Sequence, residues 1–299
     1  MRSGNPVAPD EAVDLARGSF DFHVHAAPSL FPRATDDLQL AREARAAGMA
    51  GFVLKAHEGS TAERAALLEE AVPGIRVVGS LTLNHFVGGF NPAAVEAALA
   101  LGARVIWMPT LHAAQHLRHY GGAGYREQPS RVELRPRPPL SVLDENGRTR
   151  PEMVEILQLM AQAGAVLCTG HLAPAESLVL LRLARELGVE RRVFTHPDLA
   201  VTRVGLEVQR ELVREGVYVE KSLLTTLPAW GGQGVEELVG SIRRLGVERV
   251  LLQSDLGQAA NGSPVIGWLR GLGALVAAGM REGELRRVAG ENARELLAP

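Results

Sequence analysis

The sequence has little cysteine, almost no net charge and no long hydrophobic run. Its single cysteine, Cys168, excludes an internal disulfide and is typical of a reducing cytoplasm. The 34 acidic and 32 basic residues leave a formal net charge of −2, which excludes the basic surface of a nucleic-acid-binding protein. No apolar run approaches the ~18 residues of a membrane span, and residues 1–17 lack the basic-then-apolar pattern of a signal peptide. We therefore expect a cytoplasmic globular protein in which residues 1–17 form an N-terminal extension.

Residues with reactive side chains are scarce as well. Of the 32 basic residues, all but Lys55 and Lys221 are arginine, so these two lysines mark positions where an ammonium group with an adjustable pKa could be required. Chance survival is the alternative, and it applies more to Lys221 than to Lys55. Cys168 is out of phase with His171 along its predicted strand, so we expect it to pack under a helix rather than to act as a nucleophile.

Short β-branched runs alternate with alanine-, leucine-, glutamate- and arginine-rich segments that have helical spacing. Eight such pairs follow one another, most of them about 30 residues apart, which is the length of one strand–helix unit. The predicted strands are 19–25, 51–57, 76–83, 104–110, 165–171, 192–196, 217–221 and 249–255. The predicted helices are 36–47, 61–71, 92–101, 151–163, 174–187, 206–215, 235–245 and 264–278.

Eight alternating units in 299 residues predict a single-domain, TIM-type (β/α)8 barrel over residues 1–299. The alternative, an open doubly wound sheet, would usually show a glycine-rich phosphate loop after its first strand, where this chain has His25-Ala26-Ala27-Pro28. One connection is unusually long, because glycine and proline runs break any regular pattern in residues 111–150. We expect a long active-site loop after the fourth strand there, with a surface or subunit-contact segment as the alternative.

Ionisable side chains gather at the predicted carboxyl ends of the strands, where barrel enzymes hold their catalytic groups. His23 and His25 lie two residues apart on one strand, so both point to one side and can chelate one ion. Single nitrogen or oxygen ligands end the fifth, sixth and eighth strands. Zinc-like ions favour this ligand set, whereas a structural explanation would need each histidine to be satisfied separately. The sequence therefore predicts a metal site built from His23, His25, His171, His196 and Asp255.

The second strand places Lys55 and His57 on the face that points into the barrel. A lysine in an apolar interior is costly unless it is paired or chemically altered. Lys55 could bridge two metal ions as a carbamate, bind an anionic substrate group, or pair with Asp255 or Glu220. We expect it to belong to the site, as a metal ligand and a catalytic group. We expect substrate to be bound by three further histidines: His57, His85 and His112.

In order and strand placement, these residues resemble the amidohydrolase superfamily of metal-dependent hydrolases: His23-Val24-His25, His171, His196 and Asp255. Segments 83–92 and 107–110 also resemble an uncharacterised bacterial cytosolic branch of that group. The resemblance implies a (β/α)8 barrel with one or two divalent ions, most simply zinc, with manganese or another ion as the alternative. It implies a metal-activated water that cleaves a C–N or C–O bond of a small molecule, such as an amide, lactam, lactone or ester.

Within that resemblance, Asp255 would be the base that takes a proton from the water and delivers it to the leaving group. His196 would complete the metal shell or stabilise the developing oxyanion. The superfamily's bridging lysine or glutamate usually comes from the fourth strand and sometimes from the third, whereas Lys55 is on the second. One ion, or two ions bridged from a new direction, fit equally.

Two other functions fit parts of the sequence. Residues 21–25 and the later Ala56-His57 resemble the polymerase-and-histidinol-phosphatase type of phosphoesterase, in which the second-strand histidine is a ligand. That family usually has an aspartate where this chain has Ala56. A barrel that binds a ligand without turnover is the third function, and it predicts that loss of Asp255 leaves binding intact. Alanine- and leucine-rich helix surfaces are compatible with a homo-oligomer.

Overall fold

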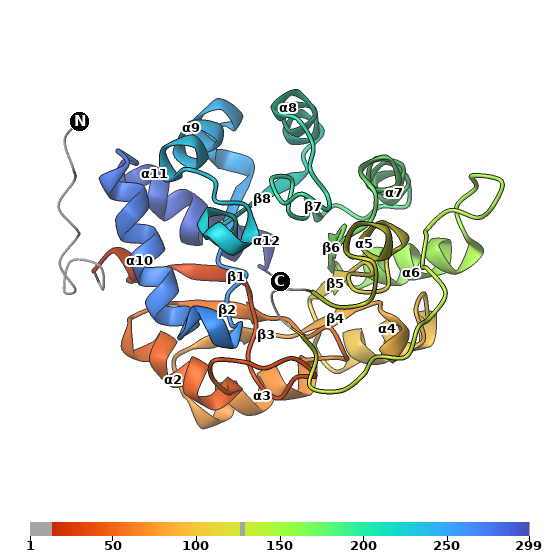
Figure 1. Cartoon of the computed structure of the whole chain (residues 1–299), viewed down its shortest axis with the longest axis horizontal. Helices are drawn as coiled ribbons and strands as arrows, with labels where there is room; N and C mark the ends of the chain where they lie inside the picture. Colours follow the sequence, from red (N-terminus) through yellow and green to blue (C-terminus); the bar gives the residue numbers. More distant parts are fainter. Residues whose placement is uncertain (1–13, 126–128, 299) are drawn as a thin grey trace.

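The computed structural model describes residues 14–125 and 129–298, in which parallel strands are surrounded by helices (Figure 1). The strands follow one another in chain order, and the first three and the last six each form a sheet in which neighbours pair in parallel. The predicted N-terminal extension, residues 1–17, lies largely outside the described residues. The strands are β1 (Phe20–Val24), β2 (Gly51–Leu54), β3 (Arg76–Val78), β4 (Ser80–Thr82), β5 (Val105–Trp107), β6 (Val166–Cys168), β7 (Arg192–Phe194), β8 (Tyr218–Ser222) and β9 (Val250–Gln253).

The third predicted strand is broken at Gly79 into β3 and β4, which corrects the continuous strand expected over 76–83. β3 pairs with β2 and β4 pairs with β5, so the two pieces together fill one position of the barrel. A Cβ at Gly79 would lie 2.5 Å from the Cα of Ala62, the first residue of α3 (Ala62–Ala71). Only glycine allows this helix to approach the strand so closely. Eight strand positions result, as the sequence predicts.

The last strand returns to the first. The Asp255 backbone N–H donates to the His23 carbonyl at 2.8 Å, and the His25 N–H donates to the Leu256 carbonyl at 2.8 Å. Val24 and Leu256 form a parallel β-bridge. These bonds join the end of β9 to the end of β1, and the predicted (β/α)8 barrel is confirmed.

The helices that cover the barrel begin and end close to the predicted bounds. Prolines occupy the first turn of four of them, and Asp36, Asn91 and Ser263 cap three by accepting a hydrogen bond from a backbone N–H. Besides α3, the covering helices are α2 (Asp37–Ala46), α4 (Pro92–Ala100), α6 (Pro151–Gln162), α7 (Pro174–Glu186), α8 (Leu206–Arg214), α9 (Val235–Leu245) and α10 (Pro264–Ala277). The chain ends with α11 (Glu282–Arg286), a π-helical turn (Arg287–Glu291) and α12 (Asn292–Leu296).

Apolar side chains form a large core between the strands and the helices and a smaller one inside the barrel. The inner core contains Phe22, Val53 and Trp107, and α12 adds Leu296. Cys168 belongs to the inner core too, which corrects the expectation that it packs under a helix. Burial raises the pKa of its thiol far above the usual value, so it remains an inert packing group.

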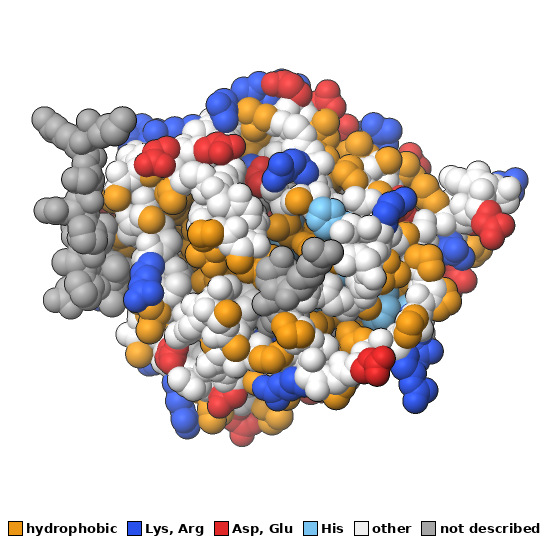
Figure 2. All heavy atoms as spheres, viewed as in Figure 1, with side chains coloured by type: hydrophobic (Ala, Val, Ile, Leu, Met, Phe, Trp, Pro, Cys, Tyr) orange, Lys and Arg blue, Asp and Glu red, His pale blue; other side chains and the backbone are white. Residues whose placement is uncertain are grey.

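The long connection after β5 contains a short helix, α5 (Ala114–Tyr120), where the sequence suggested only irregular chain. Its return is tied down by a β-bridge between Ala113 and Leu140. Figure 2 shows basic and acidic side chains interspersed over the visible face, in keeping with the balanced composition. Within the described ranges, no helix is long and apolar enough to cross a membrane.

Candidate metal centre

Three ligand atoms meet at the carboxyl ends of β1 and β9. His23 Nε2 lies 3.3 Å from His25 Nε2, and Asp255 Oδ1 lies 3.2 Å from each of these nitrogens. All three residues are buried. The structure therefore brings together the first-strand pair and the eighth-strand aspartate that the sequence predicts as ligands, in a cluster that could hold a metal ion.

An irregularity in β1 aims its histidine pair. The register between β1 and β2 shifts between Asp21 and Val24. Consequently Phe22 and His23, although adjacent, both contact the Trp107 ring inside the barrel. Asp21 instead accepts hydrogen bonds from the backbone N–H groups of His23 and Ser254, and burial raises its pKa to about 7. The bulge thus turns His23 inward while Asp21 holds the backbone beneath it.

Two of the candidate ligands sit on strained backbone. His196 follows β7 with φ 53°, Asp255 follows β9 with φ 52°, and they are the non-glycine residues with positive φ in the described part of the chain. This conformation costs roughly 1–2 kcal/mol per residue and concentrates at functional sites. The strain identifies these two strand ends as positions where side-chain direction matters more than stability.

The hydrogen bonds around the cluster suit a cation. His25 Nδ1 lies 2.9 Å from the Lys55 carbonyl oxygen, so it carries the proton and leaves Nε2 with a lone pair facing the cluster. A tetrahedral zinc ion with bonds of about 2.0–2.1 Å requires ligand atoms about 3.3–3.4 Å apart. The three separations agree with that value. Two imidazole nitrogens and a carboxylate are also the donor set that zinc-like ions prefer.

Glu220 of β8 is a member of the site that the sequence analysis named only as a partner for Lys55. Its Oε2 lies 3.4 Å from His196 Nδ1 and its Oε1 lies 3.9 Å from His23 Nδ1. One carboxylate thus faces two candidate ligand histidines from the ring edge opposite Asp255, whose Oδ2 is 3.5 Å from His196 Nε2. The sequence does contain a signal for this position of Glu220. Alternation along β8 puts Glu220 on the same face as Tyr218 and Ser222, which points into the barrel.

We call His23, His25, His196, Glu220 and Asp255 the inner cluster. Some of its buried hydrogen-bonding atoms have no partner within it. His23 Nδ1 and both Glu220 oxygens are buried without a hydrogen-bond partner among the described residues. Burial raises the Glu220 pKa to about 8, although the positive charge of Lys55 lowers it. A cation bound here could satisfy these buried imidazole and carboxylate atoms, whose hydrogen bonds are otherwise unmade.

Lys55 points into the barrel, as predicted. It is buried, with Nζ 4.2 Å from the centre of the Trp107 ring. Burial lowers its pKa to about 8, against the attraction of Asp255 and Glu220. Its contact with the Trp107 ring places the charge in the same buried interior as the two carboxylates. The role of Lys55 as a metal ligand and catalytic group stays a prediction.

His171 lies beside the cluster rather than in it. Its ring centre is 5.7 Å from that of His196, and its Nδ1 is 2.8 Å from His116 Nδ1. His116 comes from α5, so the long loop reaches the site. Gly170 makes the turn that places His171, because a Cβ there would lie 2.4 Å from the Met108 carbonyl oxygen. The role of His171 as a metal ligand stays a prediction.

Three predicted substrate-binding histidines separate into two groups. His57 donates to or accepts from Thr110 Oγ1 at 2.9 Å and stacks on His25 with ring centres 4.9 Å apart. His85 and His112 contact each other, with ring centres 5.0 Å apart, and His85 Nε2 bonds the Pro138 carbonyl at 2.8 Å. His57 thus lies against the candidate ligand His25, whereas His85 and His112 form a separate pair. The role of all three in substrate binding stays a prediction.

A small cavity of about 10 Å³ opens above the cluster, with room for about one water. Sequence reasoning missed Arg33, whose guanidinium contributes to the cavity wall and whose pKa burial lowers to about 10. Nothing in the local sequence distinguishes this arginine from the many others. The residues around the cavity are His25, Arg33, His57, Tyr125, His171, Leu199, Leu224, Trp230, Asp255 and Gln258.

Residues 18–220 match the model of a family described as a family of unknown function, DUF6282. The chain belongs to this family. The matched region includes every candidate site residue of this DUF6282 chain except Asp255. Among curated proteins, none matches the chain in sequence.

Solved structures of low sequence identity share the fold of this DUF6282 protein. An amidohydrolase from Pseudomonas aeruginosa is 13% identical with a TM-score of 0.63, covering 98% of this chain and 100% of the other. An organophosphorus hydrolase variant from Deinococcus radiodurans is 14% identical with a TM-score of 0.58, covering 95% and 94%. The lactonase Lmo2620 from Listeria monocytogenes is 10% identical with a TM-score of 0.56, covering 95% and 96%. The predicted resemblance to amidohydrolases is confirmed at the level of the fold.

Proposed function

We propose that this protein is a metal-dependent hydrolase that cleaves a C–N or C–O bond of a small molecule. The observation that carries the proposal is the buried trio of His23 Nε2, His25 Nε2 and Asp255 Oδ1, with mutual separations of 3.2–3.3 Å. It lies at the carboxyl ends of barrel strands, where barrel enzymes carry out their chemistry. The likeness in fold to hydrolases adds support.

The ion would be held by His23, His25 and Asp255, with His196 and His171 as the next nearest candidates. Zinc suits these donors best, and manganese or another divalent ion is the alternative. When bound, a divalent ion lowers the pKa of a water towards ~7 and polarises a substrate oxygen. Lys55 lies in the same buried interior with Nζ on the Trp107 ring, and its positive charge would oppose a second ion, which supports one ion rather than two.

Residues of the chain itself would transfer the proton, orient the substrate and position the ligands. Asp255 borders the small cavity, so its carboxylate takes the proton from water and returns it to the leaving group. Arg33 faces the same cavity and would orient an anionic or carbonyl group of the substrate. Glu220 faces the Nδ1 edges of His23 and His196, so its carboxylate would help to orient their Nε2 atoms toward a bound ion.

The position of His57 decides which kind of bond we propose as the one that is cleaved. A phosphoesterase of the polymerase-and-histidinol-phosphatase type would use it as a ligand, but here His57 bonds Thr110. It belongs neither to the His23, His25 and Asp255 group nor to the second group of described residues that could hold an ion, His23, His196 and Glu220. That position favours hydrolysis of an amide, lactam, lactone or ester. The strained backbone at His196 and Asp255 favours catalysis over a barrel that only binds a ligand. We further propose a cytoplasmic location, from the lone buried Cys168.

A substrate panel tests this function. Purified protein would be supplied with zinc or manganese and assayed with lactones, aryl esters, amides and phosphate monoesters. We expect turnover of a lactone, ester or amide that falls about 10²–10⁴-fold in Asp255→Asn, because the base is lost. The matched control is Glu211→Gln, an exposed carboxylate on α8, which should change nothing. Turnover of phosphate monoesters alone, or equal rates in Asp255→Asn, would overturn the proposal.

A further inference from the structure

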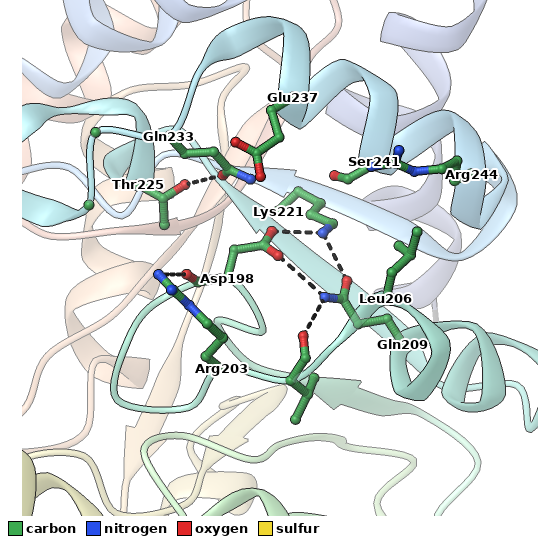
Figure 3. Close-up of a pocket in the computed structure, with 13 residues that line it drawn as sticks. Asp198, Arg203, Leu206, Gln209, Lys221, Thr225, Gln233, Glu237, Ser241 and Arg244 are labelled. Atoms are coloured by element: carbon green, nitrogen blue, oxygen red, sulfur yellow. Dashed lines mark hydrogen bonds and ion pairs between the residues drawn. The ribbon is translucent and has the colours of Figure 1, made fainter.

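A larger cavity lies outside the barrel wall, between α8 and α9 (Figure 3). Its volume is about 410 Å³, within the range of about 300–1,000 Å³ that small-molecule sites occupy. We call it the outer pocket, and its lining residues used below are Asp198, Arg203, Gln209, Lys221, Gln233 and Arg244. It is separate from the small cavity over the metal centre. The two have no lining residue in common, although both border the segment after β8.

Lys221 provides a fixed positive charge in this pocket. It follows Glu220 on β8, so it points away from the barrel interior, and its side chain is fully buried. Its Nζ donates to Asp198 Oδ2 at 2.7 Å and to Gln209 Oε1 at 2.8 Å. An ammonium group has three N–H donors, so one remains for a ligand. Figure 3 shows these three side chains meeting at the centre of the pocket.

The neighbours of Lys221 hold it in place and have little bonding capacity left. Gln209 Nε2 donates to Asp198 Oδ1 at 3.3 Å and to the Val204 carbonyl at 3.0 Å. Asp198 therefore uses both oxygens within the cluster. Such a network fixes the ammonium before any ligand arrives, which reduces the entropy lost on binding.

Two exposed arginines give the outer pocket a surplus of positive charge. Arg203 and Arg244 lie on either side of the Lys221 cluster in Figure 3. Against these three cations stand Asp198, already bonded to Lys221, and Glu237. The lining also offers the Gln233 amide nitrogen as a donor to hydroxyl groups on a ligand. The Thr225 and Ser241 hydroxyl oxygens remain as acceptors, since Thr225 donates to the Ser222 carbonyl and Ser241 donates to the Leu238 carbonyl.

We propose that the outer pocket is a second binding site, which takes a small organic anion bearing hydroxyl groups. The anionic group, a carboxylate or a phosphate, is held by Lys221, Arg203 and Arg244, and the polar side chains receive the hydroxyls. The proposal does not depend on hydrolysis at the metal centre. Lys221, for which the sequence alone left chance survival and a functional role equally open, thereby acquires a function.

Calorimetric titration of the full chain tests the proposal. The probes are glycerate for the carboxylate source, glycerol 3-phosphate for the phosphate source, and neutral glycerol. Each titration is run before and after metal is removed with a chelator, because an anion could also bind a metal ion. We expect saturable binding of one of the anions, unchanged by chelation, and none of glycerol. No saturable heat up to about 10 mM, ten times a Kd of about 1 mM, would overturn the proposal, as would heat that vanishes on chelation.

Variants locate the binding. Lys221→Met removes the anchor but could fail to fold, so the decisive variants are the exposed Arg203→Gln and Arg244→Gln. Each should weaken anion binding about 10-fold or more through loss of a charge-assisted hydrogen bond. The matched control is Arg214→Gln, an exposed arginine of α8 outside the pocket lining. Equal affinities in the two pocket variants and the control would place the anion elsewhere and refute the site.

Discussion

The two lysines of this chain lie on opposite sides of the barrel wall. Lys221 on the outside has two acceptors within 2.8 Å, and those acceptors are bonded to each other. Lys55 on the inside rests on the Trp107 ring, next to a Glu220 carboxylate whose two oxygens lack hydrogen-bond partners among the described residues. The outer cluster therefore satisfies its own acceptors and keeps one N–H donor for a ligand, whereas the inner cluster leaves buried acceptors that could hold a cation. That difference separates a preformed anchor from a metal centre.

The largest effect that sharpens this comparison is expected from Glu220→Gln. A glutamine cannot take up the negative charge that Glu220 would carry beside a bound cation, so metal affinity should fall about 10–100-fold. Competition with a chromophoric chelator measures it. Glu237→Gln, on the far side of the barrel wall in the outer pocket, is the matched control and should leave affinity unchanged. Equal affinities for the two variants would contradict the role of Glu220.

On the outer side, Lys221→Met should destabilise the fold. It leaves the Asp198 carboxylate and the Gln209 carbonyl oxygen without their donor, and we expect the free energy of unfolding to fall by about 1–3 kcal/mol. The Asp198 side chain is 16% exposed, so water compensates part of the loss. Urea denaturation measures the change. If the cluster is a unit, Asp198→Asn added to Lys221→Met will cost less than the sum of the single variants. Additive costs would mean that the two groups are uncoupled.

Lys55→Met should have a smaller effect and the opposite sign. Removing a positive charge beside Asp255 and Glu220 should tighten metal binding several-fold, because a divalent ion no longer competes with the ammonium. The same chelator competition measures it. Loss of one of two bound ions would instead identify Lys55 as a bridging ligand and refute electrostatic pairing.

The smallest effect is expected at Glu284, a carboxylate away from both lysines that already bonds two arginines. Glu284 accepts from Arg281 at 2.7 Å and from Arg243 at 3.0 Å, and these hydrogen bonds lower its pKa from 4.5 to about 2. A lowered pKa stabilises the fold above pH 4.5, and this stability is lost as the pH falls towards 2. The Tm of Glu284→Gln should therefore lie slightly below that of the wild type at pH 7 and converge with it in acid. A constant difference across that range would contradict the assignment.

Much of the fold could be predicted because local patterns in the amino-acid sequence determine it. The alternation of β-branched and helical segments gave eight units, and the positions of proline and glycine gave most helix ends. The break at Gly79 could not be foreseen, since it depends on how closely α3 approaches the strand. The helix α5 was missed because its residues lie between glycine- and proline-rich stretches that suggested irregular chain.

The candidate metal centre, too, could be predicted only in part. His23, His25 and Asp255 stand at strand ends, where alternation and strand order place them near one another. Glu220 was recognised only as a partner for Lys55, because the position of a single carboxylate within a strand does not indicate that it faces two histidines. Arg33 was missed because its approach to the cavity depends on the folded path of the loop after β1.

Metal content per chain tests the central claim most directly. Protein purified without added metal, and again after zinc or manganese is supplied, would be measured by inductively coupled plasma mass spectrometry together with His23→Ala/His25→Ala. We predict about one divalent ion per wild-type chain and none in the double variant. A wild-type protein that stays empty after metal is supplied, or a double variant that keeps its ion, would contradict the account.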